Sequence, residues 1–272
     1  MVDLAFPIVV PTASLGYTEH MARVIVVANQ KGGVGKTTTV ANLGAALAEA
    51  GRRTLVMDLD PQGALTTSAG LDHFHLSPTT YSLLMTDSVQ IRGIVRKLDE
   101  HLWIAPGGVD LAAIEYTLTS FQDRNVRLRK KLHGRLDNLD FVLIDTPPNL
   151  GLLTTNALVA ADELLIPVQC QYLAMRGVRS LLETVWLVHE RLHPELRLLG
   201  LLPTLYQPQS SHCSDVVREL RSVFGPRVFD TVVEFDDAAA MAPAARKSAV
   251  TYKPDSKASK AYRQLAEEIL YE

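Results

Sequence analysis

Cysteine is scarce in this chain of 272 residues: there are two, Cys170 and Cys213, far apart and without a C-x-x-C spacing. Such usage does not fit a disulfide framework, so we expect reduced structural thiols. No apolar run approaches the roughly 20 residues that a membrane-spanning helix needs. The first twenty residues also lack the basic start and continuous apolar stretch of a signal peptide.

An excess of charge of one sign is also missing, since 27 lysines and arginines face 30 aspartates and glutamates, for a net charge of −3. The molecule as a whole is therefore not a polyanion binder, and any nucleic-acid contact must come from a local patch. Hydrophobic residues make up 47% of the chain, enough for a sizeable core. The length fits one large α/β domain.

Short apolar runs alternate with segments of helical periodicity along most of the chain. This alternation predicts an α/β fold: a single doubly wound domain whose mostly parallel sheet carries helices on both faces. The expected strands are residues 24–28, 54–59, 103–105, 141–144, 163–168 and 198–205. The expected helices are residues 36–49, 111–132, 175–192, 214–224 and 257–270. Residues 61–100 are less regular and are expected to hold switch loops and small helices.

The start of the chain stands apart from this pattern. Met21 begins the string MARVIVVANQKGG, which would itself make a plausible start. We therefore expect residues 1–20 to be a dispensable or disordered extension, or a misassigned start, and residues 21–272 to form the domain.

A glycine-rich loop lies between the first expected strand and the first expected helix. It fits the phosphate-loop form G-x-x-x-x-G-K-[ST] except that Gln30 replaces the first glycine, so K-G-G-x-G-K-[ST] describes it better. The glycines let backbone N–H groups turn inward around phosphates, and the helix N-terminus adds its dipole. We expect Lys36 to reach the β- and γ-phosphates of ATP and Thr37 to bind Mg²⁺. The nucleotide-binding residues are Lys31, Gly32, Gly33, Val34, Gly35, Lys36, Thr37 and Thr38. A turn that only joins strand to helix is the alternative, which the Lys-Thr ending disfavours.

Acidic residues end two of the expected strands. Asp145 closes the run FVLID, which is the Walker B arrangement for holding Mg²⁺ through its water shell. Asp58 and Asp60 stand at the end of the second strand, in DLDPQG. Ligands of parallel α/β sheets bind at these carboxyl ends. A turn-initiating role for Asp60-Pro61 is the alternative.

Taken together, these residues resemble the ParA/Soj partition ATPases, in the deviant-Walker group that includes MinD, a P-loop NTPase class. The similar strings are residues 28–63, 140–158, 166–182 and 253–270, which span nearly all of the chain after residue 21. The resemblance implies a slow ATPase that forms a homodimer with Mg·ATP and binds DNA without sequence preference. It also implies a ParB-like partner protein that stimulates ATP hydrolysis. It also implies a cytoplasmic, nucleoid-associated location and no membrane partner.

The resemblance assigns roles that spacing alone does not. Lys31 matches the lysine that crosses the dimer interface to the partner's nucleotide, and Asp60 matches the carboxylate that positions the attacking water. Asp58 lies near the magnesium and Tyr206 at the nucleotide. The implied catalytic set is Lys31, Lys36 and Asp60, and the implied metal set is Thr37, Asp58 and Asp145.

The chain departs from the family at surfaces outside the phosphate loop. Gln207 stands where relatives often carry aspartate, Arg176 replaces the acid of A-L-E-G, and Ala238 replaces an arginine implicated in DNA binding. These departures indicate that partner and DNA surfaces have diverged.

Two basic tracts are candidates for phosphate contacts. The first comprises Arg124, Arg127, Arg129, Lys130, Lys131 and Arg135. The second, which the resemblance favours for DNA, comprises Arg246, Lys247, Lys253, Lys257, Lys260 and Arg263. A solvated charged face is the alternative for both.

Two other functions compete with DNA segregation. A MinD-like or orphan ATPase would position a protein or membrane-associated cargo, and a membrane switch would need a terminal basic amphipathic helix; the acidic ending EEILYE disfavours it. A non-catalytic module or an iron–sulfur reductase subunit is the other alternative, against which stand the complete set Lys36, Asp60 and Asp145 and the placement of the two cysteines.

Overall fold

The computed structural model describes residues 22–171 and 174–271, so the expected extension at residues 1–20 lies outside the described residues. The chain forms a seven-stranded sheet in the order β3-β4-β2-β5-β1-β6-β7. The β3–β4 pair is antiparallel and the other pairs are parallel. The strands are β1 (Arg23–Val27), β2 (Thr54–Asp58), β3 (Arg96–Asp99), β4 (Leu102–Ala105), β5 (Phe141–Asp145), β6 (Glu163–Gln169) and β7 (Arg197–Thr204).

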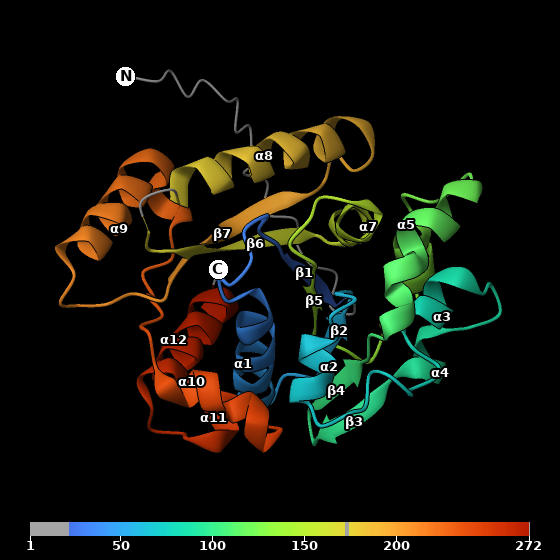
Figure 1. Cartoon of the computed structure of the whole chain (residues 1–272), viewed down its shortest axis with the longest axis horizontal. Coiled ribbons are helices and arrows are strands. Elements are labelled where there is room, and N and C mark those ends of the chain that lie inside the picture. The colour runs from blue at the N-terminus through green and yellow to red at the C-terminus, as the bar shows by residue number, and fades with distance from the viewer. Residues whose placement is uncertain (1–21, 172–173, 272) are drawn as a thin grey trace.

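Helices cover both faces of this sheet (Figure 1). One face carries α7 (Leu152–Ala160), α8 (Ala174–Arg191) and α9 (Ser211–Phe224), and the other carries α1 (Lys36–Glu49) and α12 (Lys257–Tyr271). The expected doubly wound α/β architecture is therefore confirmed. The shorter helices are α2 (Ala64–Ser68), α3 (Thr80–Met85), α4 (Ile91–Ile94), α5 (Ile114–Thr117), α6 (Arg127–Leu132), α10 (Asp237–Met241) and α11 (Ala249–Tyr252).

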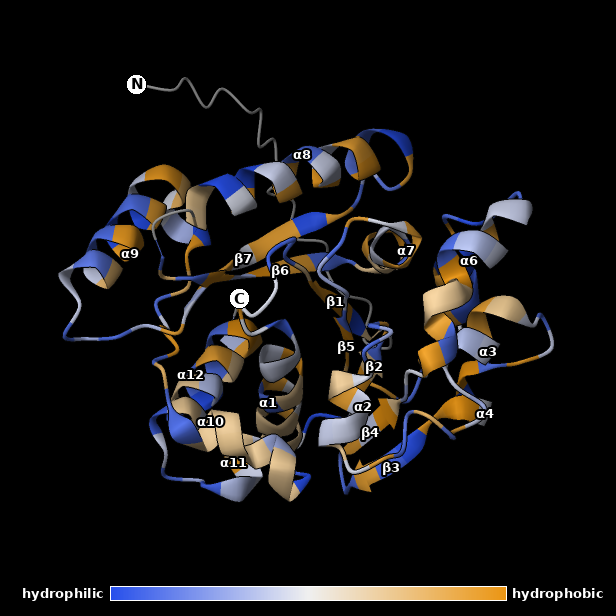
Figure 2. Cartoon of the chain, in the orientation of Figure 1, coloured by the Kyte–Doolittle hydropathy of each residue, from blue (hydrophilic) through white to orange (hydrophobic). Residues whose placement is uncertain are grey.

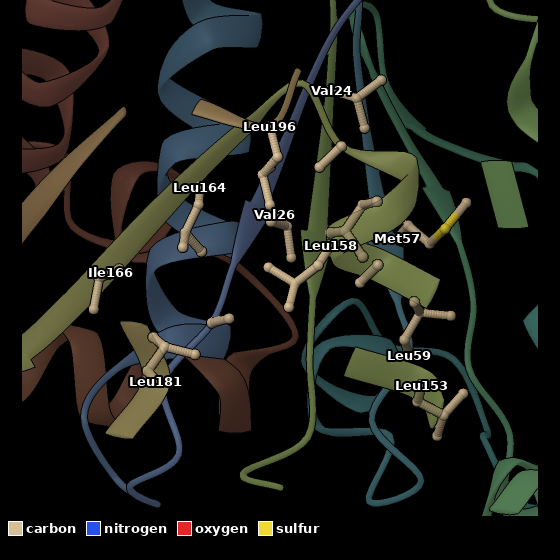
Figure 3. Packing of buried hydrophobic residues seen from close by; sticks show 14 of the residues in the cluster. Val24, Val26, Met57, Leu59, Leu153, Leu158, Leu164, Ile166, Leu181 and Leu196 are labelled. Carbon is tan, nitrogen blue, oxygen red and sulfur yellow. The ribbon is translucent and has the colours of Figure 1, made fainter. Parts of the chain in front are cut away.

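The strands are apolar on both sides because each side faces a helix layer. Along β1, Val24 and Val26 enter the core under α7 and α8, whereas Ile25 and Val27 enter the core under α1 and α12. Figure 2 shows the central strands as mainly hydrophobic, while α8 and α9 mix hydrophobic and hydrophilic residues. In Figure 3, Val26 lies near Leu158 of α7, and Leu181 of α8 lies below Leu164 and Ile166 of β6, all in one core cluster.

Helix α1 begins and ends where glycines allow it. Gly35 precedes it with φ at 91° and Gly51 follows it with φ at 79°, both in the left-handed region that glycine adopts without strain. Gly44 brings the helix close to the sheet, since a Cβ there would stand 2.5 Å from a methyl of Val56. The helix that carries Lys36 and Thr37 is thereby held rigidly on the sheet.

The expected strands are confirmed to within one residue at either end. The expected continuous helix over residues 111–132 is wrong: short 3₁₀ turns flank α5, and α6 begins only at Arg127. Arg127 is buried and donates to the Leu84 carbonyl and to Asp87 and Asp123, which fixes a turn where the helix would have continued. Sequence reasoning also missed β3 and α7.

The two cysteines are both buried and not bonded to each other. Burial raises the pKa of the Cys170 thiol to about 12, which makes it inert as a nucleophile. Both cysteines are thus buried in the core, and their reduced state stays a prediction. Within residues 22–171 and 174–271, no helix has the length and apolar character needed to span a membrane.

Candidate nucleotide site

Three elements of the expected site meet at one edge of the sheet. Strand β5 lies between β1 and β2, and its last residue, Asp145, pairs in register with Val27 of β1 and with Asp58 of β2. Because the pairs are parallel, the loop that follows β1 and both carboxylates stand together at the carboxyl end. The placement predicted from the sequence is therefore what the fold produces.

The glycine-rich loop has the backbone shape that a phosphate cradle needs. Gly33 and Gly35 have φ of 73° and 91°, and a Cβ added at Gly32 or Gly33 would meet nothing within 4 Å. Gly32 and Gly33 are exposed, so their amides are open to a ligand. Successive amides in this conformation form an anion-binding concavity beside the N-terminus of α1.

Two buried polar residues that sequence reasoning missed hold this loop in place. The Asn29 side chain accepts a hydrogen bond from the Lys31 amide at 3.0 Å and donates one to the Pro167 carbonyl at 2.7 Å. Thr204, at the end of β7, donates to the Val34 carbonyl at 2.8 Å. The loop is thus tied to β6 and β7 on the far side of β1. A polar residue at the end of an otherwise apolar strand is the signal that could have found both.

Lys36 and Asp145 form the charged floor of the site. Lys36 is buried, with Nζ 3.4 Å from the Lys31 carbonyl oxygen. Burial lowers the pKa of Lys36, and the charges of Asp145 and Asp60 act in the opposite direction. Asp145 is fully buried, and neither of its carboxylate oxygens has a hydrogen-bond partner within the described residues.

This environment of Asp145 fits a bound cation. Burial, followed by the charge of Asp58, raises the pKa of Asp145 well above its usual range, while the nearby Thr37 hydroxyl lowers it. A buried carboxylate without a donor is costly unless it binds a proton or a metal. The side chains of Asp145 and Thr37 therefore fit Mg²⁺. The described part of the chain holds no cluster of three or more His, Cys, Asp or Glu side chains with metal-binding geometry.

Asp58 is placed differently from Asp145, although both were expected near the metal. Its carboxylate accepts from the Thr66 amide at 2.9 Å, the Thr66 hydroxyl at 2.6 Å and the Asp60 amide at 3.0 Å. Burial raises its pKa to about 6 in spite of these donors. Asp60 lies just beyond the strand, nearly buried, and accepts from the Gln62 amide at 2.9 Å. Asp58 is thus engaged with protein donors, whereas Asp145 is free to bind a cation.

Lys31 and Tyr206 are also placed by the fold. The Lys31 ammonium donates to the Gln171 side chain beyond the end of β6 at 2.7 Å, in an exposed position. Tyr206 follows β7, and its hydroxyl lies 3.0 Å from that of Ser214 in α9. Within the described residues, no hydrogen bond joins the Tyr206 side chain to the glycine-rich loop. Contact of Tyr206 with a nucleotide stays a prediction.

The C-terminal basic tract is exposed but only partly free. Lys257 pairs with Glu234 at 2.6 Å, and Arg263 pairs with Glu49 at 2.6 Å. The side chains of Arg246, Lys247, Lys253 and Lys260 are exposed and form no ion pair within the described segments. Those four are the ones whose charge is open to a phosphate.

The first basic tract is engaged in the fold. Arg127 is buried with Asp87 and Asp123, and Lys130 pairs with Asp123 at 2.9 Å. Lys131 donates to three backbone carbonyls, those of Thr86, Asp87 and Val89. These cations stabilise the region around α3 and α6, which favours the structural alternative for this tract.

Comparisons with known proteins agree with this geometry. The family model described as "AAA domain" matches residues 22–198. The sporulation initiation inhibitor protein Soj of Bacillus subtilis (strain 168) is 39% identical over 249 residues, covering 92% of this chain and 98% of its own. The chromosome partitioning protein ParA of Myxococcus xanthus (strain DK1622) is 38% identical, covering 92% of this chain and 88% of its own.

A solved structure shows the same fold. Cobyrinic acid a,c-diamide synthase from Mycobacterium smegmatis, with bound ATP analogue and magnesium, is 39% identical with a TM-score of 0.81, covering 92% of this chain and 95% of that one. With the match to Soj and ParA extending over most of the chain and the phosphate loop intact, this protein belongs to the ParA/Soj family of ATPases.

Proposed function

We propose that this protein is an ATP-switched dimer that segregates DNA. Mg·ATP binds in the glycine-rich loop, two ATP-bound copies pair, and the pair holds DNA until hydrolysis releases it. Residues 21–272 form the ATPase domain in this proposal, and residues 1–20 are an extension. The protein works in the cytoplasm on the nucleoid, and a ParB-like protein stimulates its slow intrinsic turnover.

The chemistry follows from the buried charges of the site. Lys36 neutralises the β- and γ-phosphates, and Asp145 with Thr37 holds the magnesium, which removes the cost of an isolated buried carboxylate. Asp60 orients the attacking water, since its carboxyl group lies just beyond β2, at the edge where β2 and β5 bring Asp58 and Asp145 together. Asp58 orients the Asp60 backbone, through its hydrogen bonds to the Asp60 amide and to the Thr66 hydroxyl.

The observation that carries the dimer is the different placement of the two loop lysines. Lys36 is buried, whereas the ammonium of Lys31 rests on the exposed side chain of Gln171. An exposed hydrogen bond of this kind is weak, so it can be exchanged for a phosphate. Two ATP molecules facing each other carry several negative charges, and a lysine from each subunit offsets that repulsion. We therefore assign Lys31 to the nucleotide of the partner copy.

DNA binding is assigned to the exposed cations of the second tract, above all the four without an ion pair within the described residues: Arg246, Lys247, Lys253 and Lys260. One copy offers few phosphate contacts and binds weakly. A dimer joins two such patches on one body, so the second contact becomes intramolecular and the affinity rises. ATP can thus control DNA binding without changing the patch itself.

The names of the relatives point to two different uses of ATP, partition and diamide synthesis, so likeness alone does not decide what hydrolysis drives. A membrane-bound cargo role has less support. Leu265 and Ile269 of the last helix are buried against the sheet and α1, so its apolar face is already covered. A membrane switch needs that face for lipid.

The test is co-sedimentation with DNA and, separately, with anionic liposomes, each without nucleotide, with ADP and with a slowly hydrolysed ATP analogue. We expect DNA binding only with the analogue, falling steeply with salt, and no liposome binding. Lys31→Ala should retain ATP binding but lose the dimer in light scattering and lose DNA binding. Lys97→Ala, at an exposed lysine of the edge strand β3, is the matched control. An analogue-bound dimer without DNA affinity at low salt would leave cargo positioning as the better function.

A further inference from the structure

A buried chain of hydrogen bonds runs from the loop after β4 to the backbone of Asp60. The Gly107 amide donates to the Thr66 hydroxyl at 2.9 Å, and that hydroxyl donates to the Asp58 carboxylate at 2.6 Å. The other oxygen of Asp58 accepts from the Asp60 amide at 3.0 Å. The end of β2, helix α2 and the loop after β4, 41 residues beyond Thr66, are thus joined behind Asp60.

The Thr66 hydroxyl is the link on which this chain depends. A hydroxyl has one proton, and here it is used on Asp58, while a lone pair is used on Gly107. Thr66 is fully buried, so no water can take over either bond. Its amide donates to the same Asp58 oxygen at 2.9 Å. Two donors on one oxygen set the rotation of the carboxyl group, which leaves the second oxygen aimed at Asp60.

The surroundings leave the Asp58 carboxyl little freedom. A Cβ added at Gly107 would stand 3.0 Å from its carboxyl carbon, so the backbone passes close behind it. Because the Asp60 amide is bonded to this fixed group, the backbone that carries the Asp60 side chain is fixed as well. A shift of about 1 Å at such a position can cost roughly 100-fold in rate.

We propose that Thr66 is a positioning residue for ATP hydrolysis, which acts through the Asp58 carboxylate to hold Asp60 in place for the attacking water. This inference rests on the role proposed above for Asp60. It gives Asp58 an orienting task that differs from the metal-binding task of Asp145.

Thr80 provides a matched control within the same cluster. It is also a fully buried threonine, and its hydroxyl donates at 2.9 Å to Asp58, but to the backbone carbonyl and not to the carboxylate. Loss of either hydroxyl removes a buried hydrogen bond to Asp58. Only the loss of the Thr66 hydroxyl removes a donor from the carboxylate itself and so loosens its orientation.

The experiment compares Thr66→Val and Thr80→Val in the full chain, by steady-state ATPase kinetics and thermal unfolding. Both should lower the melting temperature. Thr66→Val should lower kcat by about tenfold to about 100-fold with KM nearly unchanged, whereas Thr80→Val should keep the wild-type kcat. Should Thr66→Val fail to fold, Thr66→Ser and Thr66→Ala replace it, because they differ from each other only in the hydroxyl; the serine variant should retain kcat and the alanine variant lose it.

A double variant separates this inference from the proposed function. In an Asp60→Ala background, Thr66→Val should cause no further loss of turnover, because the group that it positions is gone. Wild-type turnover of Asp60→Ala alone would overturn the water-orienting role of Asp60, on which this inference rests, while the DNA and liposome tests above decide the proposed function separately. A slow Asp60→Ala beside a wild-type kcat in Thr66→Val, or an equal loss of kcat in Thr80→Val, would overturn the positioning role only.

Discussion

The phosphate loop and the C-terminal basic tract both concentrate charge, but the two regions differ in the burial and the pairing of their charged side chains. Around the loop, Lys36 and Asp145 are buried, and Asp145 has no hydrogen-bond partner within the described residues. In the tract, Lys257 and Arg263 are more exposed and paired with the protein's own acids. A buried charge kept without a partner is expensive, so its persistence indicates a ligand. An exposed pair costs little and indicates nothing by itself.

The comparison is tested most strongly by Lys36→Ala. If Lys36 neutralises the phosphates of ATP, the loss of this buried cation should weaken ATP binding by roughly 30-fold to several thousand-fold. Isothermal titration with ATP and magnesium is the measurement. The exposed Lys97→Ala should bind as the wild type does, and an unchanged affinity in Lys36→Ala would remove the loop from the phosphate site.

Asp60→Ala should separate binding from hydrolysis. The carboxylate is bonded to the Gln62 amide and is not needed to hold phosphate, so ATP affinity and dimer formation should survive. Turnover should fall by about 100-fold or more, the usual contribution of a positioned acid or base. Single-turnover ATP hydrolysis measures this. Turnover close to that of the wild type would place the water-orienting group elsewhere.

The strands and the loop could be predicted from the sequence because their information is local. Residues 36–49 show helical periodicity, and Gly35 and Gly51 mark both ends of that helix. The start of a new helix at Arg127 could not be predicted from the sequence. Its cause is a buried guanidinium bonded to Leu84 and Asp87, which lie 43 and 40 positions earlier in the chain.

The same limit applies within the site. Lys36, Thr37 and Asp145 were found because residue type and spacing reveal them. Asn29 and Thr204 hold the loop through Pro167 and Val34, across 138 and 170 positions of sequence. Such contacts depend on the strand order of the sheet. β3 was missed because its sequence, RKLD, is short and charged, and its pairing with β4 alone makes it a strand.

The dependence of stability on pH should reveal the two buried carboxylates at the ends of β2 and β5. Burial raises the pKa of Asp58 to about 6 and also raises that of Asp145. A folded-state pKa above the unfolded value means that the protonated group favours the folded protein. That stability is complete near pH 4 and is lost as the pH rises through the folded pKa. Without ligand, the free energy of unfolding should therefore fall between about pH 4 and pH 6, by on the order of 1 kcal/mol per pH unit for each group.

Mg·ATP should reverse this trend, because the cation favours the charged form of Asp145. Denaturant titrations at several pH values, with and without Mg·ATP, are the measurement. Asp145→Asn should flatten the ligand-free slope, whereas Asp237→Asn, at an exposed acid in the first turn of α10, should leave it unchanged. A ligand-free stability that rises with pH over this range would show that the buried acids are compensated by the protein.

The smallest expected effect comes from two lysines of the same helix that differ in their pairing. Lys257 and Lys260 are both exposed and lie three residues apart on one side of α12, but Lys257 pairs with Glu234 and Lys260 forms no ion pair within the described residues. If only unpaired cations of the tract hold DNA, Lys260→Glu should weaken binding of the ATP-bound dimer more than Lys257→Glu. Each lost phosphate contact should weaken binding about equally for all sequences and reduce the salt slope by about one. Filter binding or fluorescence anisotropy over a salt series measures both quantities, and the ATPase rate of each variant is the control for folding. Equal losses from the two variants would show that Lys257 breaks its ion pair with Glu234 when DNA binds. The distinction between paired and unpaired charges would then apply only to the buried charges of the nucleotide site.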